Sequence, residues 1–220
     1  MKSAVIICNG DFPKKEYPRY LIGKADIIIC CDGALHTYLR HCRKIFGKDR
    51  RPDAVIGDMD SLGTALRRKY NDITIHDPDQ ETNDQTKAFR FVLSRYKDIS
   101  EIHIIGATGK RAEHTIGNLS LLMEYAKEYD LNAMGIKVDS VYDYGTAFAI
   151  TDTSELYCGK DRSVSIISPD STLVIKSSGL VWPTDNVIFD NLWKATLNRS
   201  SEDTVKLEFS HKSIALILLD

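Results

Sequence analysis

Two aspartates stand one residue apart directly after a short apolar run. Asp58 and Asp60 follow the apolar residues 54–57. In an extended segment alternate side chains point the same way, so both carboxylates can face one point. Converging carboxylates suit Mg²⁺, which usually takes one or two of them together with substrate phosphates. The same spacing also occurs in turns whose aspartates cap the next helix, and the pair alone does not separate the two interpretations.

A third aspartate, Asp84, stands at the start of a predicted helix over 83–96. Thr82 and Gln85 match the T-x-x-Q capping box, which places Asp84 in the first turn, where the helix dipole stabilises a carboxylate. Lys87 lies three residues later and shares the face of Asp84. Besides this structural role, a carboxylate and an ammonium group beside another acidic pair would suit a metal-bound polyphosphate.

A glycine-bearing loop, Gly106-Ala107-Thr108-Gly109-Lys110-Arg111, leads into a second predicted helix over 115–129. Such loops offer backbone N–H groups and a positive helix end to phosphate, and Arg111 would add a fork of donors. The spacing of a P-loop is absent. Glu113 and His114 follow, and each is either an exposed residue at the helix start or a base.

Apolar segments rich in Ile and Val must position these residues. The predicted strands are 4–8, 26–31, 54–57, 73–76 and 102–106, and they alternate with segments of helical spacing. This alternation predicts a mostly parallel sheet with helices on both faces. Ligands bind outside the carboxyl ends of such strands, and Asn9 and Asp32 stand there, as do the acidic pair and the glycine-bearing loop.

After residue 135 the pattern changes to short β segments separated by turns. The predicted strands are 141–150, 163–168, 173–178, 205–210 and 214–219. Strands without helices between them predict a small β-sandwich or barrel. We therefore expect an α/β domain over 1–133 and a β domain over 138–220. Trp182, in a turn-like segment of the second domain, is either a core residue or a platform for an aromatic ligand.

The composition narrows the class of protein. The 220 residues carry 29 Lys and Arg against 31 Asp and Glu, and no basic block. This balance argues against nucleic acid or a membrane surface as a partner. No apolar run approaches the ~20 residues of a membrane helix. The five cysteines form no C-x-x-C pair, which favours buried reduced thiols and a cytoplasmic protein.

Taken in order, the motifs resemble the thiamine pyrophosphokinase (thiamine diphosphokinase) family over essentially the whole chain. The resemblance implies an N-terminal α/β catalytic domain and a C-terminal β domain that helps to bind thiamine. It also implies that ATP and thiamine react with Mg²⁺ to give thiamine diphosphate and AMP, in a homodimer with the thiamine site at the subunit interface. The segments that carry the resemblance are Cys8-Asn9-Gly10, Cys31-Asp32-Gly33-Ala34, residues 52–61, Thr82–Ala88, Gly106–Asn118 and Gly179-Leu180-Val181-Trp182-Pro183.

The resemblance also implies roles for individual residues. It makes Asp58, Asp60 and Asp84 the metal-binding and catalytic carboxylates. Lys87 and Arg111 match the phosphate-side cations of the family, and Trp182 matches its thiamine-stacking aromatic residue. We further expect Asn9 and Asp32 to contact the substrates, and Ser200 to match the serine of a C-terminal Ser-Asn pair.

This chain departs from the family pattern at several positions. The family has Gly-Gly-Arg-x-Asp-His where this chain reads Gly109-Lys110-Arg111-Ala112-Glu113-His114. Lys110 therefore replaces a glycine, which can adopt backbone angles that other residues avoid. Glu113, the expected catalytic carboxylate of this loop, extends one methylene further than aspartate.

Two alternatives from other classes remain at this point. A glycosyltransferase could use Asp58 and Asp60 to bind a nucleotide-sugar through a divalent metal, and it would release a nucleoside diphosphate. A non-catalytic regulator would bind ATP and sense a ligand through its β domain without turnover.

Overall fold

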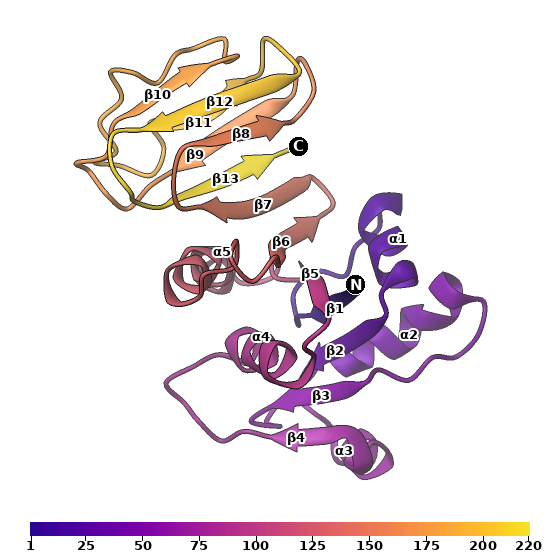
Figure 1. Cartoon of the computed structure of the whole chain (residues 1–220). Helices are drawn as coiled ribbons and strands as arrows, with labels where there is room; N and C mark the ends of the chain where they lie inside the picture. Colours follow the sequence, from indigo (N-terminus) through magenta and orange to yellow (C-terminus); the bar gives the residue numbers. More distant parts are fainter. The chain divides into compact units, whose positions relative to one another are not determined.

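The computed structural model describes residues 1–220, and the chain divides into two compact units. The N-terminal unit contains Met1–Leu119 and Leu131–Asp143, and the C-terminal unit contains Ser120–Asp130 and Tyr144–Asp220. The first is built around a parallel sheet with helices, and the second around antiparallel strands (Figure 1). The predicted fold class is therefore confirmed. None of the helices is both long and apolar enough to cross a membrane.

The N-terminal unit is centred on parallel strands. These are β1 (Lys2–Ile7), β2 (Ile27–Cys31), β3 (Ala54–Gly57), β4 (Thr74–His76), β5 (Ile99–Ile105) and β6 (Lys137–Tyr142). They lie in the order β6-β5-β1-β2-β3-β4, and each pair of neighbours is parallel. The chain first builds outward from β1 to β4 and then returns to the other side of β1. The gap between β1 and β5 is thus the switch point at which such sheets bind ligands.

Helices cover both faces of this sheet. Those that contact its strands are α1 (Glu16–Lys24), α2 (Ala34–Phe46) and α4 (Asp84–Arg95), and the remaining helices of the chain are α3 (Thr64–Lys69) and α5 (Ala112–Glu128). Val5, Ile28 and Val55 form one apolar cluster with buried residues of α1 and α2. Successive residues of a strand point to opposite faces of the sheet. The neighbours of Val5, Ile28 and Val55 along their strands therefore face the other side, where α4 packs on β1, β2 and β3 (Figure 1).

The first strand predicted for the β region, over 141–150, is wrong in its continuity. The structure has two strands there, β6 and β7 (Gly145–Ile150), and β6 pairs with β5 in the parallel sheet. A turn separates them, and in it the carboxylate of Asp143 accepts hydrogen bonds from the backbone N–H groups of Lys14 and Lys15. On β5, His103 faces Asp139 of β6, with 2.7 Å between its Nδ1 and the carboxylate.

The C-terminal unit is a sandwich of antiparallel strands. Besides β7, these are β8 (Ser154–Tyr157), β9 (Ser163–Ile167), β10 (Ile175–Ser178), β11 (Ala195–Arg199), β12 (Thr204–Phe209) and β13 (Ala215–Leu219). One sheet has the order β11-β9-β13-β7 within this unit, and a 3-stranded sheet has the order β10-β12-β8. Leu156, Val164, Ile175 and Val205 come from both sheets and share one core.

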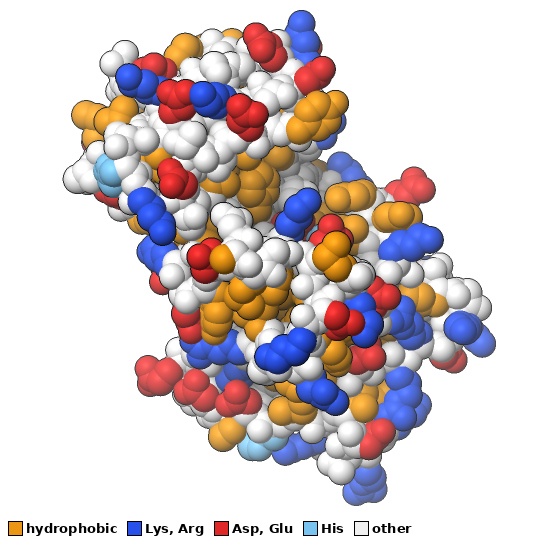
Figure 2. All heavy atoms as spheres, in the orientation of Figure 1, with side chains coloured by type: hydrophobic (Ala, Val, Ile, Leu, Met, Phe, Trp, Pro, Cys, Tyr) orange, Lys and Arg blue, Asp and Glu red, His pale blue; other side chains and the backbone are white.

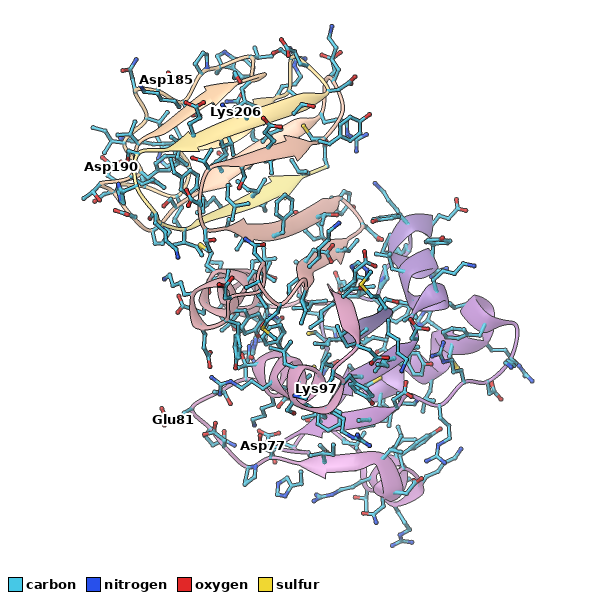
Figure 3. All side chains as sticks on the ribbon, in the orientation of Figure 1. Asp77, Glu81, Lys97, Asp185, Asp190 and Lys206 are labelled. Atoms are coloured by element: carbon cyan, nitrogen blue, oxygen red, sulfur yellow. The ribbon has the colours of Figure 1, made fainter.

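Charged side chains of both signs are interspersed over the face seen in Figure 2. A row of acidic side chains lies near the loop between β4 and α4, where Figure 3 labels Asp77 and Glu81. All five cysteines are free.

Candidate active site

Polar residues follow the parallel strands at their carboxyl ends. Asn9 comes after β1, Asp32 after β2 and Asp58 after β3, and the loop 106–111 comes after β5. The strands are parallel, so these residues share one edge of the sheet. This edge is the candidate active site.

Three carboxylates from different segments meet at this edge. Asp32, Asp58 and Asp84 each offer one oxygen, and the three oxygens lie within 4.8 Å of one another. We call these residues the acidic group. Asp32 is only 3% exposed, and its Oδ1 is buried without a hydrogen-bond partner. A buried carboxylate oxygen without a donor, beside two further carboxylates, fits a hard divalent cation such as Mg²⁺.

A glycine allows the acidic group to form. A Cβ atom at Gly57, the last residue of β3, would lie 2.8 Å from Oδ1 of Asp84 and 2.8 Å from Cβ of Asp32. Asp32 itself has φ +36°, and the backbone N–H of Ser61 donates to its Oδ2 at 2.8 Å. Any larger residue at position 57 would push the two carboxylates apart.

The acidic group is electrostatically unfavourable without a cation. Burial raises the pKa of Asp84 to about 6, and the charge of Asp58 adds to the shift, while Lys87 opposes it. Burial also raises the pKa of Asp32. The pKa of Asp58 is instead lowered, chiefly because the backbone N–H of Asp60 donates to its carboxylate. A bound cation would favour the charged form of all three.

Asp60 is placed differently from its neighbour. Its side chain is exposed and lies outside the acidic group, while its backbone N–H donates to Oδ1 of Asp58 at 3.1 Å. Met59, between them, has φ +67°, so the segment is a turn and its side chains do not alternate as in a strand. The assignment of Asp60 as a metal ligand stays a prediction.

The start of α4 brings a cation to the acidic group. The amine of Lys87 lies 3.7 Å from Oδ1 of Asp84 and donates to the carbonyl of Asp77 at 2.9 Å. Lys87 is nearly fully buried, so its charge is screened little by solvent.

The predicted capping box at this helix is wrong. The N-cap is Asn83, whose Oδ1 accepts from the backbone N–H of Thr86, whereas the hydroxyl of Thr82 donates to Asp79. Gln85 instead donates to the carbonyl of Asn118. Asp84 still stands in the first turn, as expected.

A cavity of about 300 Å³ lies beside Lys87 in the N-terminal unit. Ile56, Ile75 and Phe91 give it apolar walls. Its polar lining comes from the loop after β4 and from α4, namely Asp77, Asp79, Thr82, Lys87, Arg90 and Ser94. Lys87 and Asp77 therefore connect this cavity to the acidic group.

The loop after β5 packs closely on the loop after β1. A Cβ at Gly109 would lie 2.3 Å from Oδ2 of Asp11, so this close approach requires glycine. Lys110 has φ +54°, in the region that favours glycine, and its amine donates to the carbonyl of Asn9 at 2.7 Å and to Oδ1 of Asn9 at 3.2 Å. Both oxygen atoms of Asn9 thus accept hydrogen bonds from this loop.

Arg111 and Glu113 form an exposed ion pair. Nε of Arg111 lies 2.6 Å from Oε1 of Glu113, and this hydrogen bond is the main reason that the pKa of Glu113 is lowered. Glu113 is in the first turn of α5, and His114 beside it is exposed. Their catalytic use stays a prediction.

The C-terminal unit carries the two remaining predicted residues. Trp182 is 57% exposed, as a platform for a ligand would be and a core residue would not. Ser200 is fully buried, and its hydroxyl donates to the carbonyl of Gly159 and accepts from the N–H of Arg162. Both capacities of this hydroxyl are used within the protein.

Sequence reasoning missed several features of the edge. The sequence pattern does not indicate that Asp32 lies in the acidic group, and its expected contact with substrate stays a prediction. The amide of Gln80 donates to Oδ2 of Asp58 at 3.4 Å, and no pattern in the sequence singles this glutamine out. Asn118 joins the two loops, accepting from Asn83 and donating to the carbonyl of Ala107. Asn118 ends one of the segments that carry the family resemblance, and this is the available signal.

Two family models match this chain. "Thiamin pyrophosphokinase, catalytic domain" matches residues 18–133, and "Thiamin pyrophosphokinase, substrate-binding domain" matches residues 145–215. The chain belongs to the thiamine pyrophosphokinase family. The acidic group, Lys87 and the loop after β5 lie in the matched catalytic domain, and Trp182 lies in the matched substrate-binding domain.

Known members of the thiamine pyrophosphokinase family resemble the chain along most of its length. Thiamine pyrophosphokinase 1 of Oryza sativa subsp. japonica is 23% identical over 93% of this chain and 82% of its own. The crystal structure of thiamine pyrophosphokinase from Bacillus subtilis has a TM-score of 0.74 at 20% identity, covering 100% of this chain and 99% of that one. Thiamin pyrophosphokinase from Candida albicans has a TM-score of 0.75 at 16% identity, covering 99% and 88%.

Proposed function

We propose that this chain transfers the pyrophosphoryl group of ATP to the hydroxyl of thiamine, giving thiamine diphosphate and AMP. The observation that carries the proposal is the acidic group beside Lys87, at the ligand-binding edge of a chain of this family. Family membership leaves the glycosyltransferase and the non-catalytic regulator without support.

Magnesium is the cation that we assign to the acidic group. Asp32, Asp58 and Asp84 would hold it, and Asp60, whose charge contributes to raising the pKa of Asp32, adds negative charge nearby. When bound, Mg²⁺ neutralises charge on the phosphate oxygens and orients them. Its fit rests on the unpartnered Oδ1 of Asp32 and on the all-oxygen donor set.

The reaction asks the protein mainly for positioning and charge. The hydroxyl oxygen of thiamine attacks the β-phosphorus of ATP, and the bond from that phosphorus to the oxygen bridging the α-phosphorus breaks. AMP leaves with this oxygen, and the hydroxyl proton is released. Lys87 and Arg111 offset phosphate charge. We assign Glu113 to orient the hydroxyl, because its exposed carboxylate follows the loop after β5, in the first turn of α5, and can accept a hydrogen bond.

We assign the adenosine part of ATP to the cavity beside Lys87. Its volume of about 300 Å³ stands at the lower end of ligand sites in proteins. Ile75 and Phe91 offer apolar surface to a base, and Asp77 and Asp79 offer acceptors to ribose hydroxyls. The shared wall at Lys87 would place the phosphates toward the acidic group.

The β domain is the part of the chain to which we assign thiamine binding. We assign residues 1–133 to ATP and Mg²⁺ and residues 138–220 to thiamine, with Trp182 stacking on the cationic thiazolium or the flat aminopyrimidine. We further propose, as membership of the family implies, a homodimer in which the thiamine site lies at the subunit interface. Asn9 would support the site by accepting from Lys110 of the loop after β5. Ser200 would support it through its hydrogen bonds with Gly159 and Arg162. Five free thiols suit a cytoplasmic location.

One assay tests the reaction. Purified protein is incubated with ATP, Mg²⁺ and thiamine, and the products are separated by chromatography. Equal amounts of AMP and thiamine diphosphate are expected. ADP with thiamine monophosphate, or no thiamine-dependent product, would contradict the proposal. Omitting Mg²⁺ and adding EDTA should abolish the reaction.

A further inference from the structure

Both main-chain polar groups of Trp182 are held by one side chain. The backbone N–H of Trp182 donates to Oδ1 of Asn198 at 3.2 Å, and Nδ2 of Asn198 donates to the carbonyl of Trp182 at 2.6 Å. Asn198 is only 7% exposed, and its Oδ1 also accepts from the N–H of Arg199 at 2.8 Å. The exposed tryptophan therefore stands on a fixed main chain.

The backbone is distorted where it presents Asn198. The pairing of β11 with β9 loses its register between Ala195 and Asn198. Leu197 has φ +56°, which a branched side chain rarely adopts, and it is 80% exposed. Its N–H donates to Ser165 Oγ rather than to a strand partner. An extra residue in a strand reverses the facing of the residues after it, and here it turns the carboxamide inward.

The surrounding turn is anchored independently of this side chain. Leu180 bridges to Ser200, the N–H of Val181 donates to the carbonyl of Arg199, and the N–H of Ser201 donates to the carbonyl of Gly179. These bonds connect the two segments on their own. The turn therefore forms without Asn198, and the contacts of Asn198 fix the direction of residue 182 within it.

We propose that Asn198 is a positioning residue for thiamine binding, which it serves by fixing the direction in which Trp182 presents its ring. The inference rests on the proposed function, in which Trp182 stacks on thiamine. A ring held in one direction loses less conformational freedom when a flat ligand stacks on it, so affinity for thiamine depends on Asn198.

The loop between β10 and β11 offers a matched control. Figure 3 labels Asp185 and Asp190 in this loop, and Asn191 follows them. The Oδ1 of Asn191 accepts from the N–H of Trp193 at 3.2 Å, so it makes one similar contact to the other tryptophan of the chain. Asn191→Ala removes an asparagine of the same kind without touching Trp182.

The experiment measures the steady-state kinetics of the full-length variants Asn198→Ala, Asn198→Asp and Asn191→Ala. Asn198→Ala should raise KM for thiamine about tenfold, while KM for ATP and kcat at saturating thiamine change less than about twofold. Asn198→Asp keeps the acceptor but sets an oxygen against the carbonyl of Trp182, so KM for thiamine should rise at least as much. Asn191→Ala should leave all three constants unchanged.

Two further readouts separate direction from general destabilisation. In a Trp193→Phe background, the emission of Trp182 should lose anisotropy when Asn198 is replaced, before any ligand is added. In a Trp182→Ala background, replacing Asn198 should have no further effect on KM for thiamine, because the ring that it directs is gone.

The outcomes are distinguishable. An active wild type whose KM for thiamine is unchanged in both Asn198 variants, or additive effects in the Trp182→Ala background, would overturn the positioning role alone. A wild type that forms no thiamine diphosphate would overturn the proposed function, and this inference with it. Should Asn198→Ala not fold, the nearly isosteric Asn198→Asp carries the same comparison.

Discussion

Replacing Gly57 with alanine perturbs the acidic group without removing any of its charges. The new Cβ would lie 2.8 Å from Oδ1 of Asp84, whereas ordinary contacts begin at 3.4 Å. The carboxylate must therefore move by at least 0.6 Å, the difference between these distances. Because Cβ of Asp32 is equally close, the backbone turn after β2 must yield as well.

The expected loss follows from this displacement. A misplacement of about 1 Å near reacting groups costs about 100-fold in rate, so we expect kcat of Gly57→Ala to fall about 10- to 100-fold. This corresponds to about 1.4–2.7 kcal/mol of lost transition-state stabilisation. The concentration of Mg²⁺ that gives half-maximal rate should rise. Crowding of the buried site should also lower the free energy of unfolding by about 1–3 kcal/mol.

The assay is a Mg²⁺ titration of AMP formation at saturating ATP and thiamine, with thermal unfolding measured in parallel. Gly63→Ala is the control, because its Cβ would meet only the ring of His36, at 3.6 Å. Gly57 ends β3 and Gly63 directly precedes α3, so the two glycines flank the segment that carries Asp58. If the kcat and the Mg²⁺ midpoint of Gly57→Ala match those of Gly63→Ala, the acidic group does not depend on its close packing and the reasoning is refuted.

Three further perturbations test other parts of the site and fold. Asp32→Asn keeps an oxygen for the N–H of Ser61 but removes a buried charge, so the melting temperature in EDTA should rise while kcat falls at least about 100-fold; a lower melting temperature in EDTA would contradict a repulsive cluster. Ser94→Trp should fill the cavity beside Lys87 and raise KM for ATP but not for thiamine, whereas Arg95→Trp, outside the lining, should change neither. Burial lowers the pKa of His103, but Asp139 and Glu101 raise it more, to a net value above the ordinary 6.5. A raised histidine pKa stabilises the folded state fully below pH 6.5 and loses that contribution as pH rises through the folded value, so unfolding measured from pH 6 to 9 should show a decline that His103→Gln reduces.

Much of the site could be predicted because parallel strands deliver their following residues to one edge. Asp32, Asp58 and Lys87 needed only the strand and helix patterns to be placed there. What could not be predicted depends on single backbone angles. Met59 has φ +67°, so Asp58 and Asp60 stand in a turn and not in the extended segment that their spacing indicates.

Local competition between similar residues accounts for other differences. Thr82 and Asn83 are both good N-caps, and the structure uses Asn83, while the hydroxyl of Thr82 donates to Asp79. The role of Asn198 depends on a register break in β11, and neither β11 nor its break has a clear pattern in the sequence. The helix α2 was not among the predicted helices, although the sequence indicates it, because Leu35, Tyr38 and Cys42 are spaced as one buried face.

Lys110, in the loop after β5, combines a left-handed backbone with a tether to residue 9 in the loop after β1, and together they limit which residues can replace it. Glycine at position 110 would relieve the backbone strain of φ +54° but would remove the tether to the β1 loop. A short side chain would keep the strain and lose the tether, so intermediates between glycine and a long cation are disfavoured. The shorter tether contact, 2.7 Å, goes to the main-chain carbonyl of residue 9, which every amino acid supplies. Position 110 is therefore constrained both by its backbone angle and by the tether, whereas the shorter contact of the tether does not depend on which residue stands at position 9.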